Sequence, residues 1–137
     1  TPLVVGDRLD TDIAGANAAG LPSLMVLTGV NSAADMVHAI PSERPDYLAA
    51  DLRSLDAPAE ALRIGPHPAW KVEAAGEDVT VYATGESADD ALSIVRATAC
   101  AVWAGTANGR VRITAGDDTA RAALDRWSLL AAADPLA

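Results

Sequence analysis

Short apolar runs alternate with segments of helical periodicity in the first part of the chain. The apolar runs at residues 3–5, 23–27 and 47–49 predict buried strands, and the segments 11–19 and 32–39 between them predict helices. Strands and helices that alternate through short connections are typical of a parallel sheet flanked by helices. We therefore expect an α/β fold in this part, with a Rossmann-like parallel sheet.

Residues that start and stop helices support these boundaries. Asp10 or Thr11 can cap the first helix, and Gly20, which a Leu-Pro pair follows, ends it because glycine tolerates the left-handed turn. Ser32 precedes the second helix, and Asp35 stands three residues later, which is an approximate capping box. Each predicted helix therefore has a defined start in the sequence.

The composition changes between residues 58 and 68, where three prolines and a glycine predict a linker. Beyond it, residues 70–74 and 79–83 alternate apolar and polar positions around a Gly-Glu-Asp turn, which predicts a β-hairpin. His67 lies in the linker and His38 on a short helix. We expect both histidines to be solvated rather than catalytic.

A long helix is expected after the hairpin. Ser87 can cap it, Asp89 and Asp90 suit its first turn, and Gly105 ends it. Apolar residues at helical spacing form its buried stripe, namely Leu92, Val95, Ala99 and Val102.

A strand over residues 110–114 and a final helix, capped by Asp117 or Asp118, complete the C-terminal part. Residues 69–137 are therefore expected to form a small β-β-α-β-α domain. The chain has no phenylalanine, so we expect its three tryptophans to anchor the core, and we favour this over an aromatic platform for a ligand. These tryptophans are Trp70, Trp103 and Trp127.

Composition narrows the classes of function. Half of the 137 residues are apolar, and the formal net charge is −9. A diffuse negative charge repels phosphodiester backbones, so nucleic acid is not an expected partner. No apolar run reaches the roughly 18 residues that span a bilayer, and no signal-like stretch is present, so we expect a cytoplasmic protein without membrane contact. The single cysteine, Cys100, excludes an internal disulfide.

The chain begins with Thr1 and enters a strand pattern at once. An apolar strand of a parallel sheet normally has neighbours on both sides. We therefore expect residues 3–5 to form an interior strand, whose further neighbours come from an N-terminal fragment of the same protein. That fragment is the expected polypeptide partner, and a homo-oligomer is the other assembly we consider.

Candidate chemistry is concentrated between Gly6 and Ile13, in the run GDRLDTDI. An apolar strand ends here at Asp7, and a second carboxylate, Asp12, follows five residues later near the start of a helix. Open α/β sheets bind ligands at the carboxyl ends of their strands, and Mg²⁺ takes one or two carboxylates while it keeps several waters. Asp7 is therefore the expected Mg²⁺ ligand. Asp12 is expected to accept hydrogen bonds from the turn or to orient metal-bound water.

The remaining polar residues of the run have simpler explanations. Arg8 can neutralise local negative charge or meet a substrate, and Thr11 is expected to support the site without binding the metal. Asp10 is best explained as a helix cap. Capping could also account for Asp12, but it does not require an aspartate at the end of the strand, so it leaves Asp7 unexplained.

This run resembles the fourth sequence motif of phosphatases of the haloacid dehalogenase (HAD) type, in the form typical of the NagD-like subclass with a large C2-type cap. The resemblance extends through PLVVGDRLDTDIAGANAAGLPSLMVLTGV and the later RPDYLAADLRSL, so it covers residues 2 to about 57. The motif, its spacing and both flanking segments agree with those of this subclass, so the resemblance is specific. The apolar pattern alone would be weak evidence, because many doubly wound domains share it. Residues 1–57 are therefore expected to be the C-terminal portion of a HAD core.

The resemblance implies a mechanism. In this family one aspartate attacks phosphorus and becomes an aspartyl phosphate, and a second aspartate acts as acid and base. A hydroxyl residue and a lysine hold the phosphoryl group, and Mg²⁺ bridges nucleophile and phosphate. Only the metal ligand has a counterpart here, at Asp7, with Asp12 in support. We therefore expect no catalytic nucleophile in this chain and no activity of the chain alone, because phosphoryl transfer requires charge on the transferred group to be neutralised.

A HAD core of this subclass with an extra C-terminal α/β region resembles phosphatases of glycerol 3-phosphate whose extra region is similar to GNAT-type acetyltransferases. This resemblance implies a small phosphorylated substrate, glycerol 3-phosphate, and a place in glycerophospholipid metabolism. The acyl-CoA loop of acetyltransferases, Arg/Gln-x-x-Gly-x-Gly/Ala, does not occur in residues 58–137. An acyltransferase is therefore disfavoured.

Two functions remain in competition. The first is a Mg-dependent phosphatase whose nucleophile lies in another segment. The second is a ligand-sensing or oligomerisation module anchored on a HAD remnant. The intact motif at Asp7 favours the first, because a remnant under no chemical demand could lose this aspartate.

Overall fold

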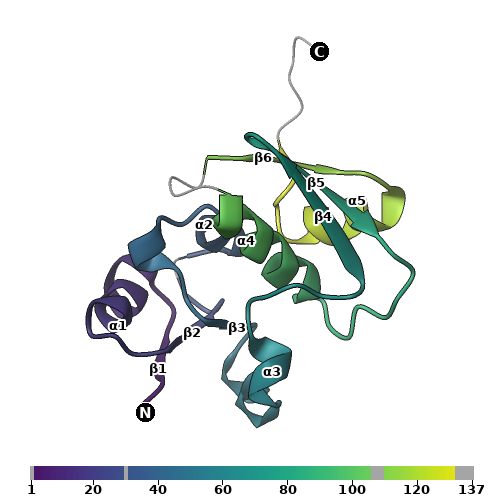
Figure 1. Ribbon diagram of the computed structural model, residues 1–137. Helices are drawn as coiled ribbons and strands as arrows, with labels where there is room; N and C mark the ends of the chain where they lie inside the picture. The colour runs from purple at the N-terminus through teal and green to yellow at the C-terminus, as the bar shows by residue number, and fades with distance from the viewer. Residues whose placement is uncertain (1, 30, 106–109, 132–137) are drawn as a thin grey trace.

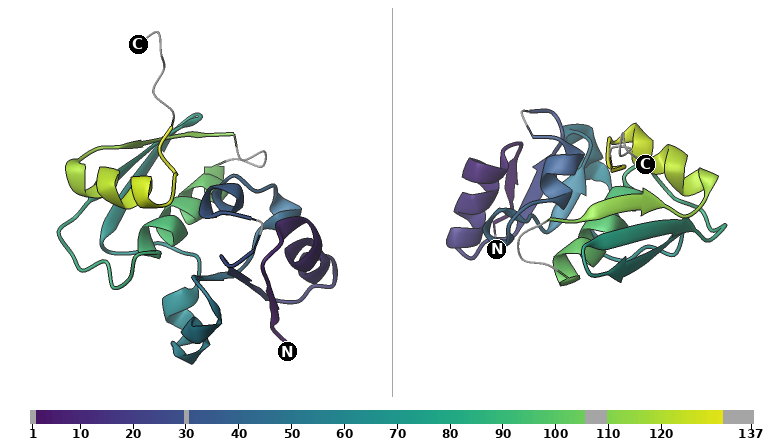
Figure 2. Two further views of the ribbon diagram at one scale, coloured as in Figure 1. Left: turned by 180° about the vertical axis from the view of Figure 1, so that it is seen from behind. Right: turned by 90° about the horizontal axis from the view of Figure 1, so that it is seen from above.

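The computed structural model describes residues 2–29, 31–105 and 110–131. Val30, which belongs to the run that carries the resemblance, lies outside these residues. Two α/β parts lie side by side, with α1 and α5 at opposite ends of the molecule and α4 between the two sheets (Figures 1 and 2). No helix in the described ranges is long and apolar enough to cross a membrane.

The first part contains a three-stranded parallel sheet of order β1-β2-β3. Val5 lies opposite Leu24, and Met25 lies opposite Leu48, so the central strand is buried on both faces. The predicted β-α-β-α-β order is confirmed. The elements are β1 (Val4–Gly6), the π-helical turn η1 (Leu9–Ile13), α1 (Ala14–Ala18), β2 (Ser23–Val26), α2 (Ala33–Val37), the 3-10 turn η2 (Pro41–Glu43), β3 (Tyr47–Ala49) and the 3-10 helix η3 (Leu52–Asp56).

The C-terminal part has the predicted β-β-α-β-α order. The hairpin strands β4 and β5 are antiparallel, and β6 pairs in parallel with β5 after the crossover through α4. Asp117 caps the last helix, as predicted, by accepting a hydrogen bond from the backbone N–H of Ala120 (2.8 Å). The elements are α3 (Ala59–Leu62), β4 (Trp70–Ala75), β5 (Asp78–Ala83), α4 (Ser93–Gly105), β6 (Arg112–Ala115) and α5 (Asp118–Arg126).

The predicted start of the long helix at Ser87 is wrong, since α4 begins at Ser93. Asp89 has a left-handed backbone with φ of 63°, which a right-handed helix does not allow. Asp90 accepts a hydrogen bond from the backbone N–H of Leu92 (3.1 Å) and also binds the side chain of Arg96. The two aspartates therefore shape the entry to the helix instead of forming its first turn.

The segment predicted as a linker packs against the first part. It contains α3, and the backbone of Arg63 forms an antiparallel bridge with Tyr47 of β3. His67 is not solvated as predicted: its side chain is 18% exposed, and its Nε2 lies 2.8 Å from the carboxylate of Asp89. Its Nδ1 accepts a hydrogen bond from the backbone N–H of Ala69, so both ring nitrogens are occupied.

One apolar core runs through both parts. Helix α4 packs on β4 and on α2, and it is buried on nearly its whole circumference over residues 93–99. All four residues of the predicted stripe are buried, although Leu92 lies just before α4 and the burial of the helix extends beyond this stripe. The core joins residues of the first part, including Met25, Met36, Val37 and Leu48, to residues of the second, including Val79, Val81, Val95, Val102 and Leu124.

The tryptophans act as core anchors. All three pack against the shared core, and each indole N–H finds an acceptor, as buried indoles require. Trp70 donates to the Ser93 hydroxyl (2.9 Å), and Trp127 donates to a backbone carbonyl before α4 (2.8 Å). Trp103 donates to the carbonyl of Val37 in α2 (3.1 Å), so it joins the two parts.

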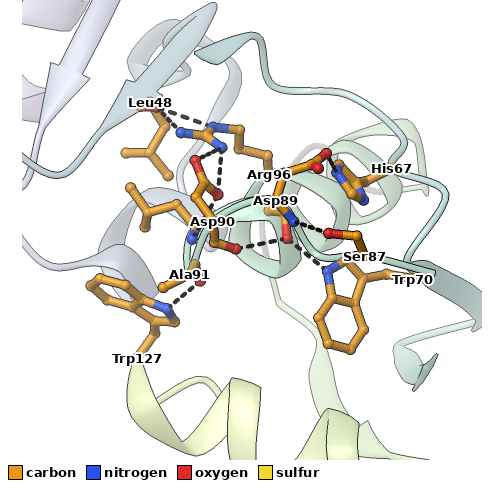
Figure 3. A network of polar contacts seen from close by, with 11 residues as sticks. Leu48, His67, Trp70, Ser87, Asp89, Asp90, Ala91, Arg96 and Trp127 are labelled. Carbon is orange, nitrogen blue, oxygen red and sulfur yellow. Dashed lines mark hydrogen bonds and ion pairs between the residues drawn. The ribbon is translucent and has the colours of Figure 1, made fainter. Parts of the chain in front are cut away.

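A buried cation also joins the two parts at β3. Arg96 of α4 donates to the carbonyl oxygen of Leu48 through Nε (3.1 Å) and Nη2 (2.7 Å), and through Nη1 to both carboxylate oxygens of Asp90 (3.0 and 2.9 Å; Figure 3). The arginine side chain is 6% exposed, and that of the aspartate is 46% exposed. The guanidinium thus covers a carbonyl on the outer edge of the sheet, where a strand edge would otherwise be unpaired.

The opposite edge of this sheet is formed by β1, which pairs with β2 alone within the described part of the chain. Leu3 and Val5 are 44% and 38% exposed there, which is high for large apolar side chains of a parallel sheet. The predicted interior position of residues 3–5 in a larger assembly therefore stays a prediction.

Candidate metal site

Two neighbouring strand ends converge on the carboxylate of Asp7. Asp7 follows β1 directly and is half-buried, and Gly29 lies three residues beyond the end of β2. A Cβ atom placed on Gly29 would overlap the carboxylate of Asp7. The glycine therefore leaves the space in which this carboxylate sits at the ligand-binding edge of the sheet.

Asp12 holds the loop that carries Asp7. Its Oδ2 atom accepts hydrogen bonds from the backbone N–H groups of Asp7 (3.2 Å) and Arg8 (3.3 Å). A Cβ atom on Gly6 would overlap the Asp12 side chain, so the glycine makes this contact sterically allowed. The carboxylate of Asp12 thus faces the loop backbone, while that of Asp7 faces Gly29.

A third loop amide is held by a residue that the sequence did not indicate. The backbone N–H of Leu9 donates to the Oδ1 atom of Asn31 (2.8 Å), which follows β2. The N–H groups of Asp7, Arg8 and Leu9 therefore all have side-chain acceptors, although the predicted cap at position 10 or 11 is wrong. The helical turn η1 begins at Leu9, and no side chain caps it locally.

The other polar residues of the motif, Arg8, Asp10 and Thr11, lie at the surface. Arg8 and Asp10 form an exposed ion pair, with Nε 3.4 Å from Oδ1. Thr11 is exposed on η1. An exposed pair of this kind contributes little to stability, which leaves both side chains available to a bound molecule or a neighbouring segment.

The donor set at Asp7 fits Mg²⁺ as this ion is bound in phosphoryl-transfer sites. Mg²⁺ uses one or two carboxylates and completes its shell with water and phosphate oxygens. Within the described ranges, no three His, Cys, Asp or Glu side chains gather closely enough to hold a metal. The described residues therefore form no complete cage of such side chains, and the assignment of the metal to Asp7 stays a prediction.

A hollow of about 500 Å³ lies beside the loop. Its charged and titratable lining residues are Arg8, Asp10, Asp35, His38 and Glu43. Three carboxylates line the hollow beside two basic side chains, so its lining has no excess of positive charge that would favour a phosphate group. A phosphorylated substrate is therefore not expected in this hollow.

The contacts that complete the site are long-range, which explains why sequence reasoning missed them. Asn31 lies 22 residues from its partner Leu9. Gly29 could be noted in the sequence as part of a Thr-Gly pair after a strand, but its role appears only when Asp7 lies against it.

Comparison with known proteins defines the class of each part. Residues 1–55 match the model of the HAD-hydrolase-like family, and residues 67–129 match that of the GCN5-related N-acetyltransferase-like domain. The chain thus combines a HAD-hydrolase-like segment with a GNAT-like domain, which confirms the resemblance of its motif.

A curated relative and two solved structures match nearly the whole chain. The chain is 57% identical over 143 residues to the D-glycerol 3-phosphate phosphatase of Mycobacterium tuberculosis, an alignment that covers 98% of the chain and 40% of the relative. Crystal structures of a glycerol phosphate phosphatase of M. tuberculosis in complex with magnesium and with calcium match with TM-scores of 0.87 and 0.89 and identities of 61% and 58%. The alignments cover 93% and 95% of the chain but only 38% and 39% of those proteins.

Proposed function

We propose that this chain forms the C-terminal part of a Mg²⁺-dependent HAD phosphatase and supplies its last metal-binding carboxylate, Asp7. The observation that supports this most is the carboxylate of Asp7 seated against Gly29 at adjacent strand ends, on a loop whose amides Asp12 holds. The chain spans about two fifths of the length of the relatives it matches, so the activity of the whole protein is part of the proposal.

Each residue of the motif has a separate task in this proposal. Asp7 binds the ion, and Asp12 keeps the loop in the conformation that aims Asp7 at the end of the sheet. Bound Mg²⁺ supplies positive charge beside the transferred phosphoryl group. Arg8 and Thr11 stand near the loop, where they orient neighbouring groups without binding the ion. The helical segment that follows, residues 9–18, contains no positive side chain, so Arg8 and the ion are the positive charges proposed beside the loop.

The nucleophile and the acid/base aspartate are proposed to lie in an N-terminal segment of the same enzyme. That nucleophile would form an O–P bond as the ester oxygen leaves with a proton from the acid, and water would then hydrolyse the aspartyl phosphate. The exposed apolar edge of β1 supports the docking of this segment beside Leu3 and Val5. The chain alone is expected to be inactive.

Glycerol 3-phosphate is the proposed substrate, because the named relatives act on it or on glycerol phosphate. A place in glycerophospholipid metabolism and a cytoplasmic location belong to the same proposal. We propose domain limits at residues 1–57 and 69–137, with a connecting segment at 58–68, close to the ranges that the two family models match.

The test is Mg²⁺-dependent phosphate release from glycerol 3-phosphate by the complete enzyme and three variants. Asp7→Asn removes a charged ligand while it keeps the shape, so turnover should fall about a hundredfold or more. Asp12→Asn should cost about tenfold, because it weakens two loop contacts. Asp10→Asn should behave like the wild type, because its ion pair is exposed.

The order of the three effects decides the assignment. Wild-type Mg²⁺ dependence in Asp7→Asn would show that another residue binds the ion. An equal loss in Asp10→Asn would contradict the separate roles of the three aspartates. A complete wild-type protein that releases no phosphate in the presence of Mg²⁺ would end the phosphatase proposal and favour the sensing or oligomerisation module.

A further inference from the structure

A hydrogen-bonded relay connects the candidate metal loop to helix α2. The backbone N–H of Leu9 donates to Asn31 Oδ1 (2.8 Å), and Asn31 Nδ2 donates to Asp35 Oδ2 (3.2 Å). The same Asp35 oxygen accepts the backbone N–H of Ser32 (3.0 Å). The amide of Asn31 thus links the loop to the carboxylate of Asp35 in the first turn of the helix.

The capping box of α2 fixes the far end of this relay. Asp35 donates its backbone N–H to the Ser32 hydroxyl (3.2 Å) and receives the Ser32 N–H in return. The hydrogen bond from the Ser32 backbone is also the main reason why the pKa of Asp35 lies below its ordinary value. The lowered pKa favours the ionised form of Asp35, and the capping box holds its carboxylate beside Asn31.

The relay fixes which way the Asn31 amide faces. With Oδ1 toward Leu9 and Nδ2 toward Asp35, both contacts are hydrogen bonds. A flipped amide would set an NH₂ group against the Leu9 N–H and an oxygen against the carboxylate, so both contacts would become repulsive. The start of α2 therefore orients the Asn31 amide so that its Oδ1 atom accepts the Leu9 N–H of the loop.

Leu9 is the point at which the loop is secured. Its side chain is 4% exposed in the shared core. Its N–H, which Asn31 holds, directly follows the N–H groups of Asp7 and Arg8, which Asp12 holds. Asp12 holds the loop from the helical turn η1, and Asn31 holds it from the segment that follows β2. Removal of Asn31 leaves a partly buried N–H without its acceptor and frees the loop on the side that faces β2.

We propose that Asn31 is a positioning residue for the metal ligand Asp7, which it holds in place through the Leu9 amide and which it couples to the capping box of α2. The inference rests on the proposed function of Asp7. Asn31 needs no contact with the ion or the substrate in this role. A partner that orients a ligand from outside the coordination shell typically changes metal affinity by about 10-fold to 100-fold when it is removed.

Three variants of the complete enzyme test the relay. Asn31→Ala removes it, and the Mg²⁺ concentration for half-maximal activity should rise about tenfold, while the substrate KM changes by less than about twofold. Asn31→Asp keeps an acceptor for Leu9 but sets a second carboxylate against Asp35, so it should also raise the Mg²⁺ requirement. In Asn31→Asp/Asp35→Asn the repulsion between the two carboxylates is removed at unchanged net charge, so part of the loss should be recovered. The recovery should be incomplete, because an NH₂ group at position 35 that donates to the carboxylate at position 31 would stand where the Ser32 N–H needs an acceptor.

Asn17→Ala is the matched control for fold and stability. Asn17 Nδ2 donates to the carbonyl oxygens of Ser42 (2.8 Å) and Arg44 (3.1 Å), so this variant also loses two amide hydrogen bonds in the first part of the chain. Its Mg²⁺ requirement should equal that of the wild type. A rise as large as that of Asn31→Ala would show a general loss of structure and would overturn the proposal.

A readout without turnover completes the test. In metal-free protein, amide hydrogen exchange of a peptide that contains Leu9 should be faster in Asn31→Ala than in the wild type or Asn17→Ala. Calorimetric titration with Mg²⁺ alone should show the weaker binding directly. Unchanged exchange and unchanged Mg²⁺ affinity in Asn31→Ala would overturn the relay. If Asp7→Asn abolishes Mg²⁺ binding in the same calorimetric titration, the proposed function of Asp7 stands even where the relay through Asn31 is overturned.

Discussion

Replacement of Arg96 with methionine should destabilise the complete protein at the junction of its two parts. The Arg96 side chain is 6% exposed, and its guanidinium makes four hydrogen bonds, two to the Leu48 carbonyl and two to Asp90. Methionine can fill the space of the arginine stem, but it donates no hydrogen bond. The variant therefore isolates the polar contribution of this side chain from its packing.

The magnitude follows from the exposure of each partner. The Leu48 carbonyl loses both donors in a buried position, which costs about 1–3 kcal/mol, and loss of the charge-assisted bonds adds to this. The carboxylate of Asp90 is 46% exposed and regains water, so its loss of a partner adds little. We expect a total of about 3 kcal/mol, and about half of this for Arg96→Lys, whose ammonium cannot serve both partners at once.

Urea unfolding followed by tryptophan fluorescence measures this change. Trp103 donates to Val37 across the same junction, so its emission reports on the separation of the parts. The midpoint should fall by about 1–2 M urea in Arg96→Met. Arg53→Met is the control, because Arg53 is 92% exposed in its ion pair with Asp51, and it should leave the midpoint unchanged. A midpoint for Arg96→Met equal to that of the control would refute the reasoning.

Two further changes test the site and the second part. Gly6→Ala would place a methyl group on the Asp12 side chain and displace the loop, so the Mg²⁺ requirement of the complete enzyme should rise, whereas Gly15→Ala meets no atom within 4 Å and should leave it unchanged. The pKa of Asp117 lies below its ordinary 3.8, mainly because of the N–H donated at its helix cap. The wild type should therefore melt at a higher temperature than Asp117→Ala above pH 3.8, and this difference should disappear as the pH falls through the lowered pKa of the folded state. Melting curves of both proteins from about pH 2 to 7 measure the difference.

Local patterns predicted most of the fold, because strand burial and helix starts depend on neighbouring residues. The capping box at Ser32 and the cap at Asp117 are both present where the sequence placed them. The start of α4 was wrong because Asp90 binds Arg96, six residues along the chain, instead of the helix start. Nothing in the local sequence around Asp90 distinguishes these two uses of a carboxylate.

The candidate site was predicted in outline for the same reason. Asp7 and Asp12 could be placed from a strand pattern followed by a helix pattern, because both are local. Their supports come from residues far along the chain: Gly29 against Asp7, and Asn31 on Leu9. Single-sequence patterns carry no information about such pairs, so these contacts required the structure.

The core shared through α4 sets an order of events during synthesis. The side chains of Met36 and Val37 in α2 are buried in a cluster that includes residues of α4, such as Val95 and Val102. The ribosome makes the first part of the chain before this helix, so the face of α2 that carries Met36 and Val37 has no cover from α4 until the helix has emerged. The HAD-hydrolase-like segment can therefore complete its packing only after about residue 105, the end of α4, has emerged. A nascent chain that stalls before that point would display an apolar surface to chaperones and proteases.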